Sequence, residues 1–204
     1  AVAVGIELVP GVELSAYEGP EEVHLLGLHL DRLDDMQRAL EVFRHARRER
    51  AEDMVRLQNE IGVRITFEDV LAVAGTAALG RPHVARALVG NGWAMDLRDA
   101  FDKYLGAGRP AYLDKRRILI AEAIALVHDC GGIAVLAHPG SDGTRERVEG
   151  LVAAGLDGVE VLHPSHSAGD RARLLALVNH FGLVPSGGSD SHGGGDSARV
   201  VGAL

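Results

Sequence analysis

The sequence predicts an α/β protein interrupted by a mostly helical segment, and three observations point to this fold. From residue 118 onward, short apolar runs alternate with amphipathic helical stretches, which is the pattern of βαβ units in a parallel sheet or barrel. Two earlier strand patterns, at 12–16 and 23–30, are separated by a turn containing Gly and Pro. Between these parts, residues 34–116 have the apolar spacing of helices.

The helical segment begins with a long amphipathic helix at 34–61. Its apolar residues recur at spacings of three and four, and its charges alternate in sign along an i,i+4 ladder. Shorter helices are expected at 67–74, 82–89 and 97–105. The long helix also contains a basic cluster, formed by Arg44, Arg47, Arg48 and Arg50. This cluster could indicate RNA binding, but a solvated, salt-bridged helix is the favoured interpretation.

The alternating section that follows has six expected elements. Helices are predicted at 118–129, 144–154 and 170–181, and strands at 133–137, 158–162 and 183–185. The strands are short and apolar, as is typical of strands buried on both faces of a parallel sheet. Side chains at the carboxyl ends of such strands converge on one face, so the residues that follow each strand are the first candidates for a functional site.

Composition limits the function classes. The chain has 204 residues and suits one domain, or one domain with an insertion. Its formal net charge is −8, which argues against a broad basic face for nucleic acid. Cys130 is the only cysteine, so a cysteine zinc site and an intrachain disulfide are excluded and a cytoplasmic location is expected. No signal peptide or membrane-spanning apolar run is visible, and no membrane association is predicted.

Histidine and carboxylate side chains gather at the predicted strand ends. The first two strands contain Glu13 and His24, and the later strands are followed by His138, by His163 and His166, and by Asp190 and His192. Imidazole with carboxylate is a ligand set for zinc, manganese or iron. A carboxylate can bridge two metals whereas an imidazole cannot, so the set suits more than one ion sharing Glu13 or Asp190.

Each of these residues also has a structural interpretation, because a lone His at a strand end is usually capped or solvated. For His45, His128 and His180, on predicted helices, that interpretation is preferred. Asp190 and His192 are two residues apart in an extended segment, which places both side chains on one side. The sequence has no Gly-x-Ser-x-Gly, His-Glu-x-x-His or Walker motif. The expected nucleophile is therefore a water molecule activated by metal.

Four segments resemble the PHP (polymerase and histidinol phosphatase) family in order and spacing. They are Pro10-Gly11-Val12-Glu13-Leu14-Ser15, Val23-His24-Leu25-Leu26-Gly27-Leu28, Leu136-Ala137-His138-Pro139-Gly140 and Gly188-Ser189-Asp190-Ser191-His192-Gly193. The helical segment, with Gly80-Arg81-Pro82-His83, resembles the insertion of a subgroup that dephosphorylates nucleotides. That subgroup includes enzymes similar to a 3′,5′-nucleoside bisphosphate phosphatase, some of which trim RNA from the 5′ end.

The resemblance implies a distorted (β/α)7 barrel with a mostly helical insertion and a site for two or three divalent ions (Mn²⁺, Zn²⁺ or Fe²⁺). Residues 1–33 and 117–204 would be the barrel, and 34–116 the insertion. Glu13 would bridge two metals, His24 and His138 would bind one of them, Asp190 the other, and His192 the third position. Glu13, Asp190 and His192 would be catalytic, and Arg81 and His83 would bind substrate phosphate. His163 and His166 remain candidates without an assigned role.

Family members begin with strands that contain further metal ligands, and nothing before Glu13 matches them. We therefore expect two barrel strands to be missing at the N-terminus and the chain by itself to be an inactive fragment.

The function implied by the resemblance is metal-dependent hydrolysis of phosphate monoesters. The expected substrates are small nucleotides such as 3′,5′-nucleoside bisphosphates, or short 5′-phosphorylated RNA ends, with no stable protein partner. The alternatives are another PHP activity, such as histidinol phosphatase or exonuclease, and a catalytically incomplete PHP domain that serves as a structural or partner-binding module.

Overall fold

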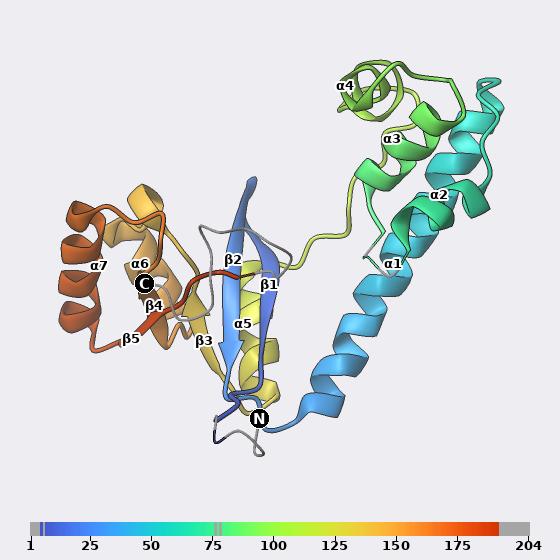
Figure 1. The fold of residues 1–204 in the computed structure, drawn as a ribbon. Helices are drawn as coiled ribbons and strands as arrows, with labels where there is room; N and C mark the ends of the chain where they lie inside the picture. The colour runs from blue at the N-terminus through green and yellow to red at the C-terminus, as the bar shows by residue number, and fades with distance from the viewer. Residues whose placement is uncertain (1–4, 6, 76, 78, 192–204) are drawn as a thin grey trace. The chain divides into compact units, whose positions relative to one another are not determined.

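The computed structural model describes residues 5, 7–75, 77 and 79–191. The chain divides into two compact units (Figure 1), which are named here by their content. The sheet unit consists of residues 1–36 and 117–204, and the helical unit consists of residues 37–116. Apart from the helix expected at 97–105, which the structure divides into two elements, every predicted helix and strand is present, with ends that differ from the predictions by at most two residues.

The sheet unit is built on a mixed, five-stranded sheet with the order β1-β2-β3-β4-β5. Its strands are β1 (Gly11–Glu18), β2 (Glu21–Leu28), β3 (Ile133–Leu136), β4 (Gly158–Leu162) and β5 (Val184–Gly187). β3, β4 and β5 pair in parallel, as predicted from the alternating section. β2 pairs antiparallel with both β1 and β3, so the sheet is mixed. The tight turn between β1 and β2 requires these two strands to be antiparallel, because only antiparallel neighbours can be joined so closely.

Three helices belong to the sheet unit. They are α5 (Ile120–Asp129), α6 (Arg145–Ala153) and α7 (Ala168–Phe181). α5 contacts β1, β2 and β3, whereas α7 contacts β4, β5 and α6. α7 begins with a capping box, in which Ser167 and Asp170 each bond the other's backbone N–H.

The two faces of the β1–β2 hairpin have different roles. Leu14 and Leu25 are buried on the face that α5 covers. Gly27 lies on the same face, where an added Cβ would be 2.8 Å from the Val127 side chain of α5. Side chains alternate along a strand, so Glu13 and His24 project from the opposite face, which is where the candidate site forms.

The helical unit contains most of α1 (Leu33–Glu60) together with α2 (Phe67–Ala74), α3 (Arg81–Gly90), α4 (Leu97–Ala100) and the π-helical turn η2 (Phe101–Leu105). It has its own buried core, to which α1, α2 and α3 contribute Met54, Val70 and Leu88. The predicted charge ladder is present, with Arg48 bonded to Glu52 at 3.0 Å. Among the described helices, none is both long and apolar enough to cross a bilayer.

Candidate metal centre

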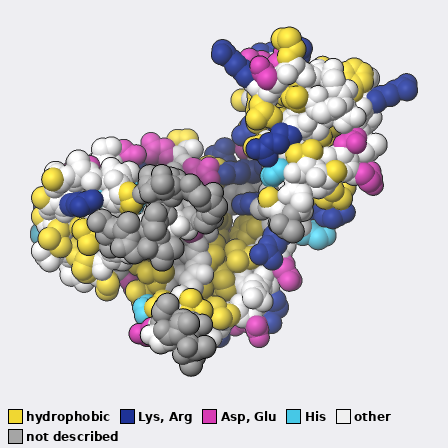
Figure 2. All heavy atoms as spheres, in the orientation of Figure 1, with side chains coloured by type: hydrophobic (Ala, Val, Ile, Leu, Met, Phe, Trp, Pro, Cys, Tyr) yellow, Lys and Arg dark blue, Asp and Glu magenta, His cyan; other side chains and the backbone are white. Residues whose placement is uncertain are grey.

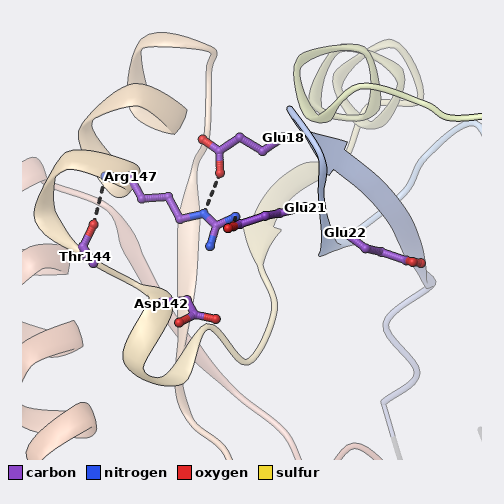
Figure 3. A pocket seen from close by; sticks show the side chains of 6 residues that line it. All are labelled: Glu18, Glu21, Glu22, Asp142, Thr144 and Arg147. Carbon is purple, nitrogen blue, oxygen red and sulfur yellow. Dashed lines mark hydrogen bonds and ion pairs between the residues drawn. The ribbon is translucent and has the colours of Figure 1, made fainter.

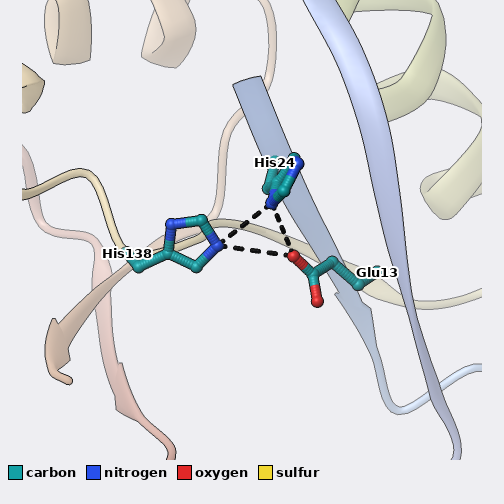
Figure 4. Close-up of side chains that lie close together, drawn as sticks. All are labelled: Glu13, His24 and His138. Carbon is teal, nitrogen blue, oxygen red and sulfur yellow. Dashed lines mark hydrogen bonds and ion pairs between the residues drawn. The ribbon is translucent and has the colours of Figure 1, made fainter. Parts of the chain in front are cut away.

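Three predicted ligands converge on the face of the hairpin opposite α5 (Figure 4). Oε1 of Glu13 lies 2.7 Å from Nδ1 of His24 and 3.4 Å from Nε2 of His138. The two imidazole nitrogens are 3.1 Å apart. Each residue therefore presents one ligand atom to a shared point, and the three atoms all lie within 4.8 Å of one another.

The sheet determines this convergence. Glu13 faces Leu26 and Ser15 faces His24 in the β1–β2 register, so Glu13 and His24 are diagonal neighbours on one face. The backbone N–H of Ala137 donates to the carbonyl of His24 at 3.0 Å. This bond holds the end of β3 beside β2 and brings His138 to the same point.

The three side chains fit a divalent cation by the chemistry of their donors. Two imidazole nitrogens and a carboxylate oxygen point at one another, and all three can offer a lone pair. A proton on one of the two facing nitrogens could form a hydrogen bond to the other nitrogen only. A cation between the three side chains would instead bind the lone pairs of both nitrogens and of the carboxylate oxygen. Mixed imidazole and carboxylate sites suit Zn²⁺, Mn²⁺ or Fe²⁺.

The fourth predicted ligand, Asp190, lies on the same side of the sheet. It lines a cavity of about 470 Å³ together with Glu13, His138 and Glu160. Its side chain is 14% exposed, and its Oδ2 lies 3.6 Å from Nε2 of His163. The predicted fifth ligand, His192, falls outside the described residues.

The two glycines before Asp190 allow the backbone of this segment to lie close to β4. A Cβ at Gly187 would lie 2.7 Å from the Cβ of Leu162, and one at Gly188 would lie 3.2 Å from Oε1 of Glu160. Larger residues would therefore push this segment away from β4 and take Asp190 with it.

The candidate ligands lie next to a buried polar layer, which consists of Glu160, His163 and His166. The sequence analysis did not identify Glu160. Glu160, in the middle of β4, is 4% exposed, and its Oε2 accepts the backbone N–H of His138 at 2.7 Å. Burial raises the pKa of Glu160, and the bond from His138 opposes that rise. The available signal was a charged residue inside an otherwise apolar strand, Val159-Glu160-Val161, because buried carboxylates need a specific partner.

His163 and His166, left without a role by the sequence, belong to the same layer. The rings of His24, His138, His163 and His166 follow one another with centroid separations of 5.0, 5.3 and 5.3 Å. Nδ1 of His166 lies 3.0 Å from the Val161 carbonyl, and its Nε2 accepts the backbone N–H of Gly140 at 3.1 Å. His166 therefore ties the segment after His138 to β4. Burial lowers the pKa of His163, and the neighbouring His138 and His166 lower it further.

Arg147 forms a bracket of ion pairs at the β1–β2 turn (Figure 3). Arg147 of α6 bonds Glu18 at 2.5 Å and Glu21 at 3.0 Å, which are the residues on either side of the β1–β2 turn. Arg147 also lines a cavity of about 150 Å³ together with His24 and His138. The bracket thus joins the tip of the hairpin to the helix that follows β3.

The predicted substrate-binding residues, Arg81 and His83, belong to the helical unit. The Arg81 guanidinium lies 5.8 Å from the ring centroid of Phe101 and 5.4 Å from that of Tyr112. Nδ1 of His83 accepts the backbone N–H of Gly80 at 3.2 Å and so caps α3. His83 therefore has a structural role that the sequence analysis did not assign to it.

Comparisons with known proteins find both curated relatives and solved structures that are similar to this chain. The chain is 35% identical over 205 residues to a 3′,5′-nucleoside bisphosphate phosphatase of Chromobacterium violaceum, covering 97% of this chain and 72% of the relative. It is 33% identical over 195 residues to the 5′-3′ exoribonuclease Rnm of Salmonella typhimurium, covering 93% and 67%. A crystal structure from Bifidobacterium adolescentis, assigned as a metal-dependent phosphoesterase, matches with a TM-score of 0.71 and 32% identity, over 98% of this chain and 73% of that one. No protein-family model matches the chain.

These relatives extend over nearly the whole chain, including the segments that contain Glu13, His24, His138 and Asp190. The first relative is itself covered over more than two thirds of its length. The four motifs, the converging ligand atoms and the similarity of fold therefore agree, and this chain belongs to the PHP family of metal-dependent phosphoesterases.

Proposed function

We propose that this protein hydrolyses phosphate esters of nucleotides with the help of divalent metal ions. The observation that supports this most directly is the convergence of Glu13, His24 and His138 on one point, in a chain whose relatives are a nucleoside bisphosphate phosphatase and an exoribonuclease. The preferred substrate class is a nucleotide with a terminal phosphate, such as a 3′,5′-nucleoside bisphosphate. Short RNA with a 5′-phosphate is the second candidate, because the second relative is a 5′-3′ exoribonuclease.

We assign the metal-holding role to Glu13, His24, His138, Asp190 and His192. Bound Mn²⁺, Zn²⁺ or Fe²⁺ would supply an activated water and would neutralise charge on the phosphoryl oxygens. The chain's own contribution is to hold unprotonated donors at fixed positions. Glu13 is suited to a bridging role, because it is the carboxylate that both His24 and His138 approach. We also propose that the five-stranded sheet is part of the distorted barrel that the family resemblance implies.

For the substrate phosphate we propose Arg81, with a smaller contribution from His83. The helical unit carries 14 of the 21 Lys and Arg residues but only 11 of the 29 Asp and Glu residues, and several of the basic side chains project from it in Figure 2. Burial lowers the pKa of Arg50, and the nearby positive charge of Arg81 lowers it further. An anion bound by Arg81 would relieve that repulsion, and a guanidinium binds phosphate through paired hydrogen bonds.

The test is the substitution Glu13→Ala in the full-length protein, with Glu149→Ala, an exposed change on α6, as the control. We expect Glu13→Ala to lose bound metal and to lose phosphate release from adenosine 3′,5′-bisphosphate and from a 5′-phosphorylated oligoribonucleotide. The fold should persist, because the Glu13 side chain is 31% exposed and outside the core. Elemental analysis, phosphate release and a thermal melt measure the three outcomes.

Two results would contradict the proposal. A wild-type protein with no bound metal and with activity that survives chelation would exclude the metal mechanism. A wild-type protein that binds metal but releases no phosphate from either substrate would favour the alternative, a catalytically incomplete PHP domain with a structural or partner-binding role.

A further inference from the structure

One nitrogen of the buried polar layer has no hydrogen bond to any residue that the structure describes. His163 follows directly after β4 and is 3% exposed. Its Nε2 is buried and makes no hydrogen bond within the described part of the chain. A buried polar atom without a partner costs about 1 to 3 kcal/mol, so its placement needs a reason.

The contacts of the other ring nitrogen, Nδ1, determine which nitrogen of His163 carries the proton. The backbone N–H of Ser165 lies 3.1 Å from Nδ1, and the Ser165 hydroxyl lies 2.7 Å from it. A backbone amide can only donate, so Nδ1 must accept. In the neutral ring, the proton is then on Nε2, and this nitrogen is a hydrogen-bond donor.

The carboxylate of Asp190 lies beside this donor, with Oδ2 at 3.6 Å from Nε2. Asp190 has a backbone φ of 51°, a left-handed conformation that costs a non-glycine residue free energy and needs support from its surroundings. Its carboxylate lines the same cavity as Glu13 and His138. The separation exceeds a hydrogen bond, but a small rotation of the Asp190 side chain would close it.

A direct role for His163 as a metal ligand conflicts with its contacts. To bind a cation through Nε2, the neutral ring would need its proton on Nδ1. The Ser165 backbone N–H would then face an N–H group at 3.1 Å and lose its acceptor. His24 and His138 differ in this respect, because their nitrogens in the cluster face each other and Glu13.

We propose that His163 is a positioning residue, whose Nε2–H donates to Asp190 and fixes that carboxylate toward the Glu13–His24–His138 cluster. The inference rests on the proposed function, in which Asp190 is a ligand. A carboxylate that accepts such a hydrogen bond presents its remaining lone pairs in one direction. Loss of a residue that hydrogen-bonds to a metal ligand typically lowers metal affinity about 10- to 100-fold.

The experiment compares His163→Phe, which keeps an aromatic ring but no donor, with His163→Gln, whose amide can donate from a similar place. His180→Phe, an exposed change in the last turn of α7, is the matched control. Calorimetric titration with Mn²⁺ gives affinity and stoichiometry, and kinetics give kcat and KM. We expect His163→Phe to bind Mn²⁺ about 10- to 100-fold more weakly with unchanged stoichiometry. His163→Gln should stay close to the wild type, and the His180→Phe control should match it.

Three outcomes would overturn the inference. His163→Phe with wild-type affinity would show that the donor does not matter, and fewer ions bound in both His163 variants would identify His163 as a ligand. If His163→Phe does not fold, nitrogen-15 NMR of the wild-type ring decides, because a proton on Nδ1 contradicts the assignment. A wild-type protein that binds no Mn²⁺ would instead overturn the proposed function and this inference with it.

Discussion

At the scale of single residues, the candidate metal centre has unusual backbone conformations as well as a characteristic set of side chains. Among the described non-glycine residues, positive φ angles occur at His29, His138 and Asp190, and two of these are predicted ligands. Such conformations persist only where the surroundings hold them, and they concentrate at functional sites. The bond from the His138 backbone N–H to the buried Glu160 is one such support.

The sequence predicted residues that the structure brings together, but not the residues that hold them in place. The grouping of Glu13, His24 and His138 could be predicted, because each lies in a segment that resembles a family motif. Glu160, by contrast, acts by accepting one backbone N–H across two strands. That contact depends on a left-handed φ of 27° at His138, and no residue type at that position indicates such a conformation in advance.

Arg81 offers a test of substrate binding at this scale. We expect Arg81→Ala to raise KM for phosphate-bearing nucleotides by roughly tenfold or more, because charge-assisted bonds are worth about 1.5 to 3 kcal/mol. Arg81→Lys should recover part of this, since it keeps the charge but not the paired geometry. Arg86→Ala, an exposed change on the same helix, is the control. Steady-state kinetics measure the effect, and unchanged KM in Arg81→Ala would remove Arg81 from the substrate site.

At the scale of elements, amphipathic helices were the most predictable part of the chain and irregular turns the least. Residues 97–105 were expected to form one helix, but the structure contains α4 followed by the π-helical turn η2. The Gly106 backbone N–H bonds the Phe101 carbonyl at 2.8 Å. A Cβ at Gly106 would lie only 2.8 Å from that oxygen, so the wider turn depends on glycine there, and apolar periodicity does not reveal it.

The hairpin and α6 give a test of how one element positions another. Arg147 is 15% exposed at its side chain and pairs with Glu18 and Glu21. Arg147→Met keeps most of the apolar stem but removes both pairs, and we expect a stability loss of about 1 to 3 kcal/mol. Because His24 is three residues beyond Glu21 on β2, metal affinity should fall as well.

Denaturant unfolding and Mn²⁺ titration measure the two effects of Arg147→Met separately. Arg145→Met, an exposed change in the first turn of the same helix, is the matched control. Lower stability with unchanged metal affinity would mean that the bracket supports the fold without positioning His24.

At the scale of the whole molecule, the residues proposed for metal and those proposed for substrate belong to different units. Every described residue proposed to hold metal belongs to the sheet unit, whereas Arg81 and His83 belong to the helical unit. The sheet order and the antiparallel pairing of β2 with β3 were beyond the sequence analysis, because they depend on which strands meet across the long helical segment between them. Local sequence patterns predict each strand, but they do not predict which strands lie beside it in the sheet.

The separate cores lead to a prediction about independence. Leu88 is fully buried in the core of the helical unit, together with Met54 and Val70. Leu88→Ala should destabilise that unit by about 2 to 5 kcal/mol, through lost burial and the cavity left behind. The Glu13–His24–His138 cluster lies in the other unit, so its affinity for Mn²⁺ should stay at the wild-type value.

Hydrogen exchange followed by mass spectrometry can follow the two units in one sample of Leu88→Ala. We expect protection to fall in α1, α2 and α3 but to persist in β2, β3 and α5, since partly independent units open with different free energies. Leu97→Ala, at a leucine that is 40% exposed in the same unit, is the matched control. Equal loss of protection in both units would show that they fold as one cooperative body. In that case, a defect in the helical unit would weaken metal binding through global unfolding.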